Sequence, residues 1–331
     1  MRAHRLTTPG PVEGNPLELE QLPVTQPGPG QLLLRVRTCG VCHTDLHLVE
    51  GDIRPPELPR TPGHQVVGDV AVLGPQVQGW AVGDRCGLAW LHRACGDCPY
   101  CRQGQENLCQ RAAFTGFHVD GGFAEYVLAE ADYALRLPPK IPDGQAAPLL
   151  CAGIIGYRSL RQADLAPGER LGLVGFGASA HLALQVARHW GCEVFVFSRS
   201  EKHRRLAREL GAAWAGGVEQ SAPGMLDRAV IFAPAGPLVP VTLEKLRPGG
   251  TLALNAIHMS PIPEMAYGLL YGERTLRSVA NATRQDGIEF LQLAGEIPMR
   301  IRVQEYPFEQ ANRALLDLKL SRIEGAGVLR L

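Results

Sequence analysis

The sequence predicts an α/β protein of two domains, one mostly β and one built on a doubly wound parallel sheet. Its 331 residues exceed the usual size of a single domain. Over about the first 150 residues, short apolar runs alternate with Gly and Pro, as in QLLLRVRTCG, HQVVGDVAVLG and GFAEYVLA, which is typical of strands joined by turns. After Leu149, strand-like and helix-like segments alternate, which favours βαβ units and a parallel sheet.

The parallel-sheet domain is expected over residues 153–286. A helical pattern covers 154–161, and the buried-strand run LGLVGFG and a helix over 180–190 follow it. The next expected elements are the strand EVFVFS, the charged helix EKHRRLARELGA, and the strands RAVIFAP and GTLALNA with VPVTLEKLR between them.

We place the second domain boundary at the turn signal Asp286-Gly287. The strand RIRVQEYP and the helix EQANRALLDLK are then predicted to return to the β domain. That domain would therefore comprise residues 1–152 and 287–331.

Composition excludes several classes of function. Lys plus Arg and Asp plus Glu both number 33, so nothing indicates binding to nucleic acid or to an anionic membrane surface. No stretch approaches the roughly 18 apolar residues of a membrane helix, and MRAHRLTTPGPVEG lacks the apolar run of a signal peptide. We expect a cytoplasmic protein, in which cysteines stay reduced; nine is also an odd number for a disulfide framework.

A short segment, about residues 92–112, contains two successive C-x-x-C steps in ACGDCPYCRQGQENLC. Its four cysteines are Cys95, Cys98, Cys101 and Cys109. Four thiolates predict a closed tetrahedral zinc site, whose metal would supply the folding free energy of this polar lobe. Buried free thiols and an iron–sulfur cluster are the alternatives. A saturated site cannot accept substrate, so a catalytic metal would have to lie elsewhere.

A second metal site is suggested by GVCHTDLH, TPGHQVVG and LLCAGIIGY. Cys42, His64 and Cys151 could form a Cys₂His zinc site with one open position, although spacing alone does not establish it. The other three cysteines are interpreted as small core residues: Cys39, Cys86 and Cys192. In a strand, Cys39 would point away from Cys42 because their spacing is odd.

The stretch GFGASA follows the strand LGLV and opens a helix, as a dinucleotide-binding turn does. Gly175 permits the tight turn, Gly177 lets the backbone approach a pyrophosphate, and Ala180 replaces the third glycine. Helical N–H groups from Ala178 onward would face the phosphates.

The cofactor preference depends on the end of the next strand, EVFVFSRS. An NAD site usually has an acidic residue there, whereas this sequence has Ser198 followed by Arg199. A hydroxyl and a guanidinium suit the 2′-phosphate of NADP, with Lys202 and Arg204 close by. A solvated basic helix with NAD as cofactor is the alternative.

Together these motifs resemble the zinc-dependent alcohol dehydrogenases of the medium-chain dehydrogenase/reductase superfamily, in their order and over nearly the whole chain. The resemblance implies a chaperonin-like (GroES-like) catalytic domain plus a Rossmann domain. It also implies two zinc ions per chain: a catalytic zinc on Cys42, His64 and Cys151, and a structural zinc on the four-cysteine lobe.

The resemblance further implies the roles of three residues around the catalytic zinc. Asp45 would orient His64 through its ring N–H, unless it is simply a turn residue. Thr44 would hydrogen-bond the reacting oxygen, and its proton would leave through the nicotinamide ribose to His47. Imidazole groups titrate near neutral pH; an ordinary surface histidine is the alternative.

The implied function is reversible hydride transfer between a small or aromatic primary alcohol and NAD(P), with NADP(H) favoured, in a dimer or tetramer. Trp90, Ile53 and Ile257 are candidates for the substrate pocket, unless they are core residues. A NAD-dependent, secondary-alcohol or polyol dehydrogenase is the enzymatic alternative. A degenerate, non-catalytic metal- and nucleotide-binding protein is the other, and the complete set of catalytic residues argues against it.

Two positions depart from the family pattern. Gln65 follows His64 where most relatives have Glu, so no carboxylate can serve there as a temporary zinc ligand. Ala326 stands where many relatives have an Arg on the cofactor phosphates. We expect His43 or Arg322 to be the possible substitutes for that Arg.

Overall fold

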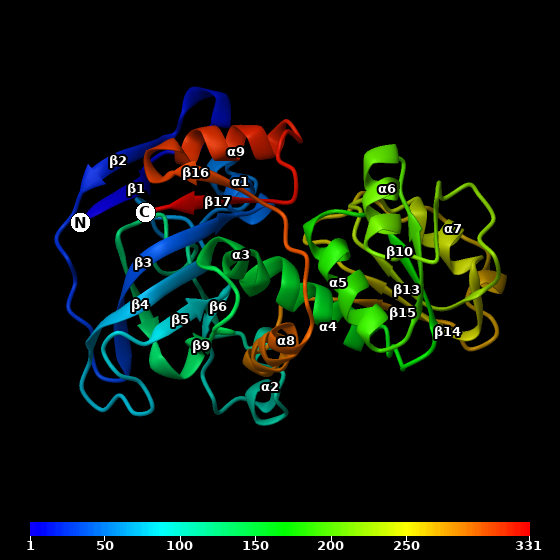
Figure 1. The fold of residues 1–331 in the computed structure, drawn as a ribbon, viewed down its shortest axis with the longest axis horizontal. Helices are drawn as coiled ribbons and strands as arrows, with labels where there is room; N and C mark the ends of the chain where they lie inside the picture. The colour runs from blue at the N-terminus through cyan, green and yellow to red at the C-terminus, as the bar shows by residue number, and fades with distance from the viewer. The chain divides into compact units, whose positions relative to one another are not determined.

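The computed structural model describes residues 1–331 and divides them into two compact units, each described here by itself (Figure 1). Unit 1 consists of Met1–Cys151, Asn281–Glu296 and Ile301–Leu331. Unit 2 consists of Ala152–Ala280 and Ile297–Arg300.

The second boundary lies at 280/281, before the predicted 286/287. Asp286 and Gly287 do not form a turn; they lie in the first turn of α8 (Arg284–Glu296). Thr283 and Asp286 bond reciprocally, because the Asp286 carboxylate accepts from the Thr283 backbone N–H at 2.8 Å and the Thr283 hydroxyl accepts from the Asp286 N–H at 3.1 Å. This pair caps the helix and explains why the Asp-Gly signal was misleading.

Unit 1 is built around a seven-stranded sheet of order β16-β17-β3-β4-β5-β9, with β8 also paired to β3. All of these pairs are antiparallel except β16–β17, which is parallel. Two small antiparallel pairs, β1–β2 and β6–β7, complete its strands. The strands are β1 (Arg2–Leu6), β2 (Leu17–Gln21), β3 (Gln31–Val41), β4 (Gln65–Leu73), β5 (Arg85–Leu88), β6 (Leu91–Arg93), β7 (Ala113–Phe114), β8 (Tyr126–Glu130), β9 (Leu135–Arg136), β16 (Val303–Pro307) and β17 (Ala326–Arg330).

Helices of unit 1 connect and cover these strands, and α9 lies along β16 and β17 (Figure 1). Besides α8 they are α1 (His43–Glu50), α2 (Pro99–Arg102), α3 (Asp143–Pro148) and α9 (Ala311–Lys319), with 3₁₀ turns at Val12–Gly14, Glu106–Leu108, Ala131–Tyr133 and Phe308–Gln310. A π-helical turn, Leu149–Gly153, follows α3 and spans the first unit boundary. The core includes Leu32, Leu34 and Val36 of β3, which point inward, while Arg35 and Arg37, on either side of Val36, point to solvent.

Unit 2 contains a six-stranded, all-parallel sheet of order β12-β11-β10-β13-β14-β15. In chain order this is 3-2-1-4-5-6, the doubly wound Rossmann order, so the predicted fold class is confirmed. Its elements are α4 (Ile154–Gln162), β10 (Arg170–Val174), α5 (Ala178–His189), β11 (Glu193–Phe197), α6 (Glu201–Glu209), β12 (Trp214–Gly216), β13 (Leu226–Ile231), α7 (Leu238–Leu243), β14 (Leu246–Leu254), a 3₁₀ turn at Tyr267–Leu269, and β15 (Thr275–Ser278).

None of the helices combines the length and apolar character that crossing a lipid bilayer requires.

Candidate metal centres and nucleotide site

The four lobe cysteines converge on one point, with all four sulfur atoms within 4.8 Å of one another. The Sγ–Sγ distances are 3.5 Å for Cys98–Cys101, 3.5 Å for Cys95–Cys109 and 3.8 Å for Cys95–Cys101. A tetrahedral zinc with Zn–S bonds of about 2.3 Å would separate its sulfur ligands by about 3.8 Å. All nine cysteines of the chain are free thiols, so the lobe fits a metal and is not a disulfide framework.

Local structure gathers these sulfurs. Pro99 starts α2 directly after Cys98, and one helical turn brings Cys101 back beside it. The backbone N–H of Cys101 donates to the Cys98 sulfur and lowers the pKa of that thiol to about 7. Glu106 ties the lobe to α8, because its carboxylate accepts from the Arg284 backbone N–H at 3.1 Å and pairs with the guanidinium at 3.5 Å.

Three further candidate ligand residues meet inside unit 1. Cys42 precedes α1, His64 precedes β4, and Cys151 lies in the π-helical turn. Their ligand atoms lie within 4.8 Å of one another, and the two sulfurs are 3.9 Å apart. This cluster has three members, so its donor set fits a metal that keeps one coordination position for another molecule.

Asp45 holds this cluster together from α1. Its Oδ2 accepts from the Cys42 backbone N–H at 3.0 Å, which caps the helix. Its Oδ1 accepts from the Gly63 N–H at 3.0 Å and lies 3.2 Å from His64 Nδ1. Gly63 has φ +99°, and a Cβ there would lie 2.5 Å from the Phe123 ring, so only glycine permits this approach. With Nδ1 bonded to Asp45, His64 has Nε2 left as its ligand atom.

The interactions within the cluster favour the thiolate form of Cys42, which is the form that binds a metal. A hydrogen bond from Cys151 holds the pKa of Cys42 well below its usual range, and His64 adds to this shift. Burial alone would lower the pKa of His64, but the Asp45 carboxylate and the Cys42 thiolate raise it to about 10. A metal would displace that shared proton.

The two expected relay residues lie on the same helix. Thr44 is buried, with its Oγ1 3.8 Å from the Cys42 sulfur. His47 is half-buried, and its Nδ1 lies 2.8 Å from Asp52 Oδ2. His43, at the first position of α1, is exposed.

Sequence reasoning missed Asp52. Gly51 ends α1 with φ +87°, and the N–H groups of Gly51 and Ile53 bond the His47 carbonyl at 3.1 and 3.3 Å. This turn brings Asp52 back over the last helical turn, so the Gly-Asp pair after the helix was the usable signal. Ile53 packs on the core of unit 1 and thereby anchors the turn.

Aromatic rings surround the expected pocket residue Trp90. Its ring meets His64 edge-on at 5.1 Å, stacks on Phe114 at 5.1 Å and tilts against Phe117 at 5.9 Å. Phe114 and Phe117 both lie in the stretch FTGFH, but of these aromatic residues only Trp90 was predicted from the sequence to line the pocket. Ile257 belongs to unit 2 and is 72% exposed.

The glycine turn follows β10 in unit 2, at the point where the strand order reverses. Gly175 has φ +87°, and a Cβ there would lie 2.9 Å from the Ala233 backbone N after β13. Around Gly177 a Cβ would meet nothing within 4 Å, so open space lies beside the start of α5 at Ala178. Free helical N–H groups facing open space at a switch point fit a dinucleotide phosphate.

The residues after β11 differ in their exposure and in their hydrogen bonds. Ser198 is buried, and its hydroxyl accepts from the Ser200 N–H at 3.3 Å. Arg204 is already engaged, with Glu201 at 2.6 Å and with the Ser198 carbonyl at 3.2 Å. Arg199 and Lys202 are exposed.

The structure also shows the surroundings of the two residues that depart from the family pattern, Gln65 and Ala326. Gln65 is buried on β4 against Gly40, where an added Cβ would lie 2.8 Å from Gln65 Oε1. Ala326 is buried at the start of β17. Arg322 pairs with Asp317 at 3.5 Å inside unit 1, so its guanidinium is committed within the fold.

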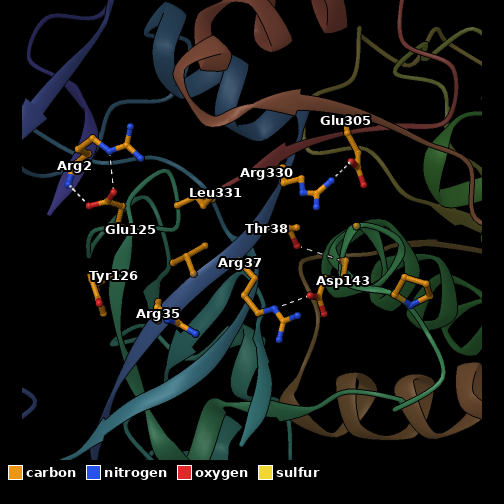
Figure 2. A pocket seen from close by; sticks show the side chains of 13 residues that line it. Arg2, Arg35, Arg37, Thr38, Glu125, Tyr126, Asp143, Glu305, Arg330 and Leu331 are labelled. Carbon is orange, nitrogen blue, oxygen red and sulfur yellow. Dashed lines mark hydrogen bonds and ion pairs between the residues drawn. The ribbon is translucent and has the colours of Figure 1, made fainter. Parts of the chain in front are cut away.

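A polar cavity of about 820 Å³ opens elsewhere on unit 1, and Figure 2 shows its lining. Its four arginines are paired: Arg37 with Asp143 at 2.7 Å, Arg2 with Glu125 at 2.8 Å, Arg330 with Glu305 at 3.5 Å and Arg35 with Asp69 at 3.7 Å. None of the ligand or glycine-turn residues lines it, so its chemistry is separate from the metal centres.

Two family models match the chain. The alcohol dehydrogenase GroES-like domain matches residues 28–139, and the zinc-binding dehydrogenase domain matches residues 180–296. Both predicted domain types are thereby confirmed.

Known proteins agree with these models. The probable alcohol dehydrogenase AdhA of Mycobacterium tuberculosis (strain CDC 1551 / Oshkosh) is 47% identical, covering 99% of this chain and 97% of that protein. A solved cinnamyl alcohol dehydrogenase from Sorghum bicolor has a TM-score of 0.90 at 28% identity, covering 100% and 98%. A cobalt- and zinc-bound thermostable alcohol dehydrogenase from Pyrobaculum aerophilum has a TM-score of 0.89 at 25% identity, covering 100% and 99%. The chain therefore belongs to the alcohol dehydrogenases of the medium-chain dehydrogenase/reductase superfamily.

Proposed function

We propose that the chain is a zinc-dependent alcohol dehydrogenase that favours NADP(H) and interconverts small or aromatic primary alcohols and their aldehydes. The observation that carries this proposal is the convergence of Cys42, His64 and Cys151 with one position left for substrate. The four-cysteine lobe is the proposed site of a second, structural zinc. When bound, zinc supplies a Lewis acid for the substrate oxygen, and the nicotinamide accepts or returns the hydride.

The chain's own groups orient the reactants and move the proton. Asp45 fixes the His64 ring so that Nε2 faces the ligand cluster. We propose that the Thr44 hydroxyl, which is buried, hydrogen-bonds the substrate oxygen, and that His47, on the same helix, takes the proton toward solvent. The Asp52 carboxylate keeps the His47 ring oriented by accepting from Nδ1.

A direct test measures the change in nicotinamide absorbance with ethanol, benzyl alcohol and their aldehydes, alongside zinc analysis of the same preparation. Turnover of primary substrates with zinc present supports the proposal. Turnover only of secondary alcohols or polyols would instead favour that enzymatic alternative, since the same ligand cluster serves those substrates too.

We expect His47→Gln to lower kcat by roughly 10- to 100-fold at neutral pH. This loss is at or below the low end of the rate contribution that a positioned acid–base group typically makes. The loss should shrink at high pH, where hydroxide can take the proton. Asp52→Asn should give a smaller loss of kcat. In the double variant, Asp52→Asn should cause no further loss beyond that of His47→Gln. The measurement is kcat against pH for the three variants.

His189→Gln is the control for the relay, because His189 is exposed on α5 in unit 2. It should behave as the unmodified enzyme at every pH. A pH–rate profile that His47→Gln leaves unchanged would contradict the relay assignment.

NADP(H) preference is proposed from Ser198 and Arg199. A carboxylate at position 198 would repel the 2′-phosphate, whereas the exposed Arg199 can bond it. A hydrogen bond to a charged group contributes roughly 1.5–3 kcal/mol, which is roughly 10- to 100-fold in preference. Solvent exposure favours the low end of that range.

Ser198→Asp is therefore expected to reverse the cofactor preference, and Arg199→Ala to erode it while NAD(H) kinetics stay nearly constant. The measurement is kcat/KM for NADPH and NADH on one aldehyde at fixed salt. Arg205→Ala is the matched control, because Arg205 is exposed on α6 and pairs with Glu209 at 3.8 Å. An NADH preference in the unmodified enzyme would refute the assignment.

The compartment and assembly are proposed on two observations. Nine free thiols, seven of them in the two proposed zinc sites, suit the reducing cytoplasm.

The edge strand β15 and the exposed Tyr267 and Tyr271 near it suit a homo-oligomer contact.

A further inference from the structure

A row of aromatic side chains leads away from the metal ligand His64. We define the aromatic shelf as Trp90, Phe114 and Phe117, all in unit 1. Trp90 touches His64 edge-on, and its interplanar angle with Phe114 is only 12°. An aryl group whose reacting carbon lies at the ligand cluster would find ring faces and edges to pack on along this shelf.

His118 lies at the end of the shelf. Its ring centroid is 4.8 Å from Phe117, at an interplanar angle of 81°, and 5.4 Å from Phe114. The backbone N–H of Phe114 donates to His118 Nδ1 at 3.2 Å. Since Nδ1 accepts, the proton of the neutral ring is on Nε2. Two ring contacts and one hydrogen bond fix the direction of this donor, and none of the protein hydrogen bonds uses it.

The surroundings of His118 favour the neutral form of its ring. Burial, and then the positive charge of Arg60, lower the pKa of His118. Arg60 is itself buried and shares the Asp120 carboxylate with Arg5, at 3.2 and 2.9 Å. Arg60 also lies 3.9 Å from Glu57, so two carboxylates balance the two guanidinium groups and the region carries no net charge.

We infer that His118 is a specificity-determining residue, whose Nε2–H donates to an oxygen acceptor at the far end of an aryl aldehyde or alcohol held on the aromatic shelf. This inference rests on the proposed function. The substrate class is an aryl aldehyde or alcohol that carries a methoxy, carbonyl or carboxylate group opposite the reacting carbon.

The test compares 4-methoxybenzaldehyde with 4-ethylbenzaldehyde, which have nearly the same shape but differ in the acceptor oxygen. The quantity measured is the ratio of their kcat/KM values. Their intrinsic difference in reactivity cancels, because the same pair is compared between the enzyme and its variants.

His118→Asn keeps an acceptor for the Phe114 N–H and removes the Nε2 donor. Loss of one hydrogen bond should reduce the methoxy-to-ethyl ratio by roughly two- to tenfold. His118→Gln, whose amide reaches the position of Nε2, should retain most of the ratio. His258→Asn, exposed in unit 2, is the control and should leave it unchanged.

A ratio that stays the same in His118→Asn overturns the inference. If neither aldehyde is reduced with NADPH or NADH, the proposed function fails, and ligand-observed NMR then decides the inference separately. In that experiment tighter binding of the methoxy compound must be present in the unmodified protein and lost in His118→Asn. Equal binding in both proteins overturns it.

Discussion

Cys151→Ser is expected to lower kcat by roughly 10³-fold or more while the fold is retained. A Lewis acid contributes several kcal/mol to stabilising charge on the reacting oxygen, and about 1.4 kcal/mol is tenfold in rate. Serine cannot replace the thiolate that completes the cluster with Cys42 and His64. The core is expected to persist, because the Cys151 sulfur bonds the Cys42 sulfur, at 3.9 Å, and not a backbone group.

The measurement combines steady-state kinetics with zinc analysis and far-UV circular dichroism. We expect one zinc per chain in Cys151→Ser and two in the unmodified enzyme. Cys192→Ser is the matched control, since Cys192 is buried in unit 2 and bonds the Ala166 carbonyl at 3.4 Å, a bond that a hydroxyl can keep. A fully active preparation containing one zinc would refute the two-site assignment.

Cys95→Ser is expected to act on stability instead. The lobe exposes Tyr100 and Leu108 and buries only Cys109 among its four cysteines, so it has little apolar core. In such a lobe the free energy of zinc binding contributes directly to folding, and it is of the order of 10 kcal/mol for small zinc domains. Even a fraction of this loss should lower Tm by roughly 10 °C or cause aggregation.

Thermal unfolding followed by circular dichroism and light scattering measures this effect. Arg102→Ala is the control within the lobe, because Arg102 is an exposed non-ligand at the end of α2. A Cys95→Ser protein with unchanged Tm and a single zinc would mean that the lobe folds without metal.

The parts of the fold that could be predicted are those with strong local patterns. Buried strands such as β10 and β11 have uninterrupted apolar runs, and α9 has a clear helical period. The edge strands β12 and β15 were not predicted. Both are short, and each pairs with a single neighbouring strand at an edge of the sheet. Their sequences therefore carry little of the apolar signal that identifies interior strands.

Side-chain partners were harder to predict than motifs. Asp52 and His118 act through contacts that depend on where a turn brings a side chain, and no spacing rule encodes that. Asp286-Gly287 shows the converse error, because a turn-like dipeptide was recruited into the capped start of α8. The commitment of Arg322 to Asp317 is likewise visible only in three dimensions.

The division of the chain at Cys151/Ala152 has an evolutionary consequence. Every candidate metal ligand falls within Met1–Cys151, and every candidate determinant of nucleotide choice on the glycine turn and β11 falls within Ala152–Ala280. The two traits occupy non-overlapping stretches of coding sequence. Because unit 1 also contains Asn281–Glu296 and Ile301–Leu331, two crossovers are needed, one at this junction and one near Ala280/Asn281. Such an exchange would replace the determinants of coenzyme choice and leave the candidate ligand cluster with its original surroundings.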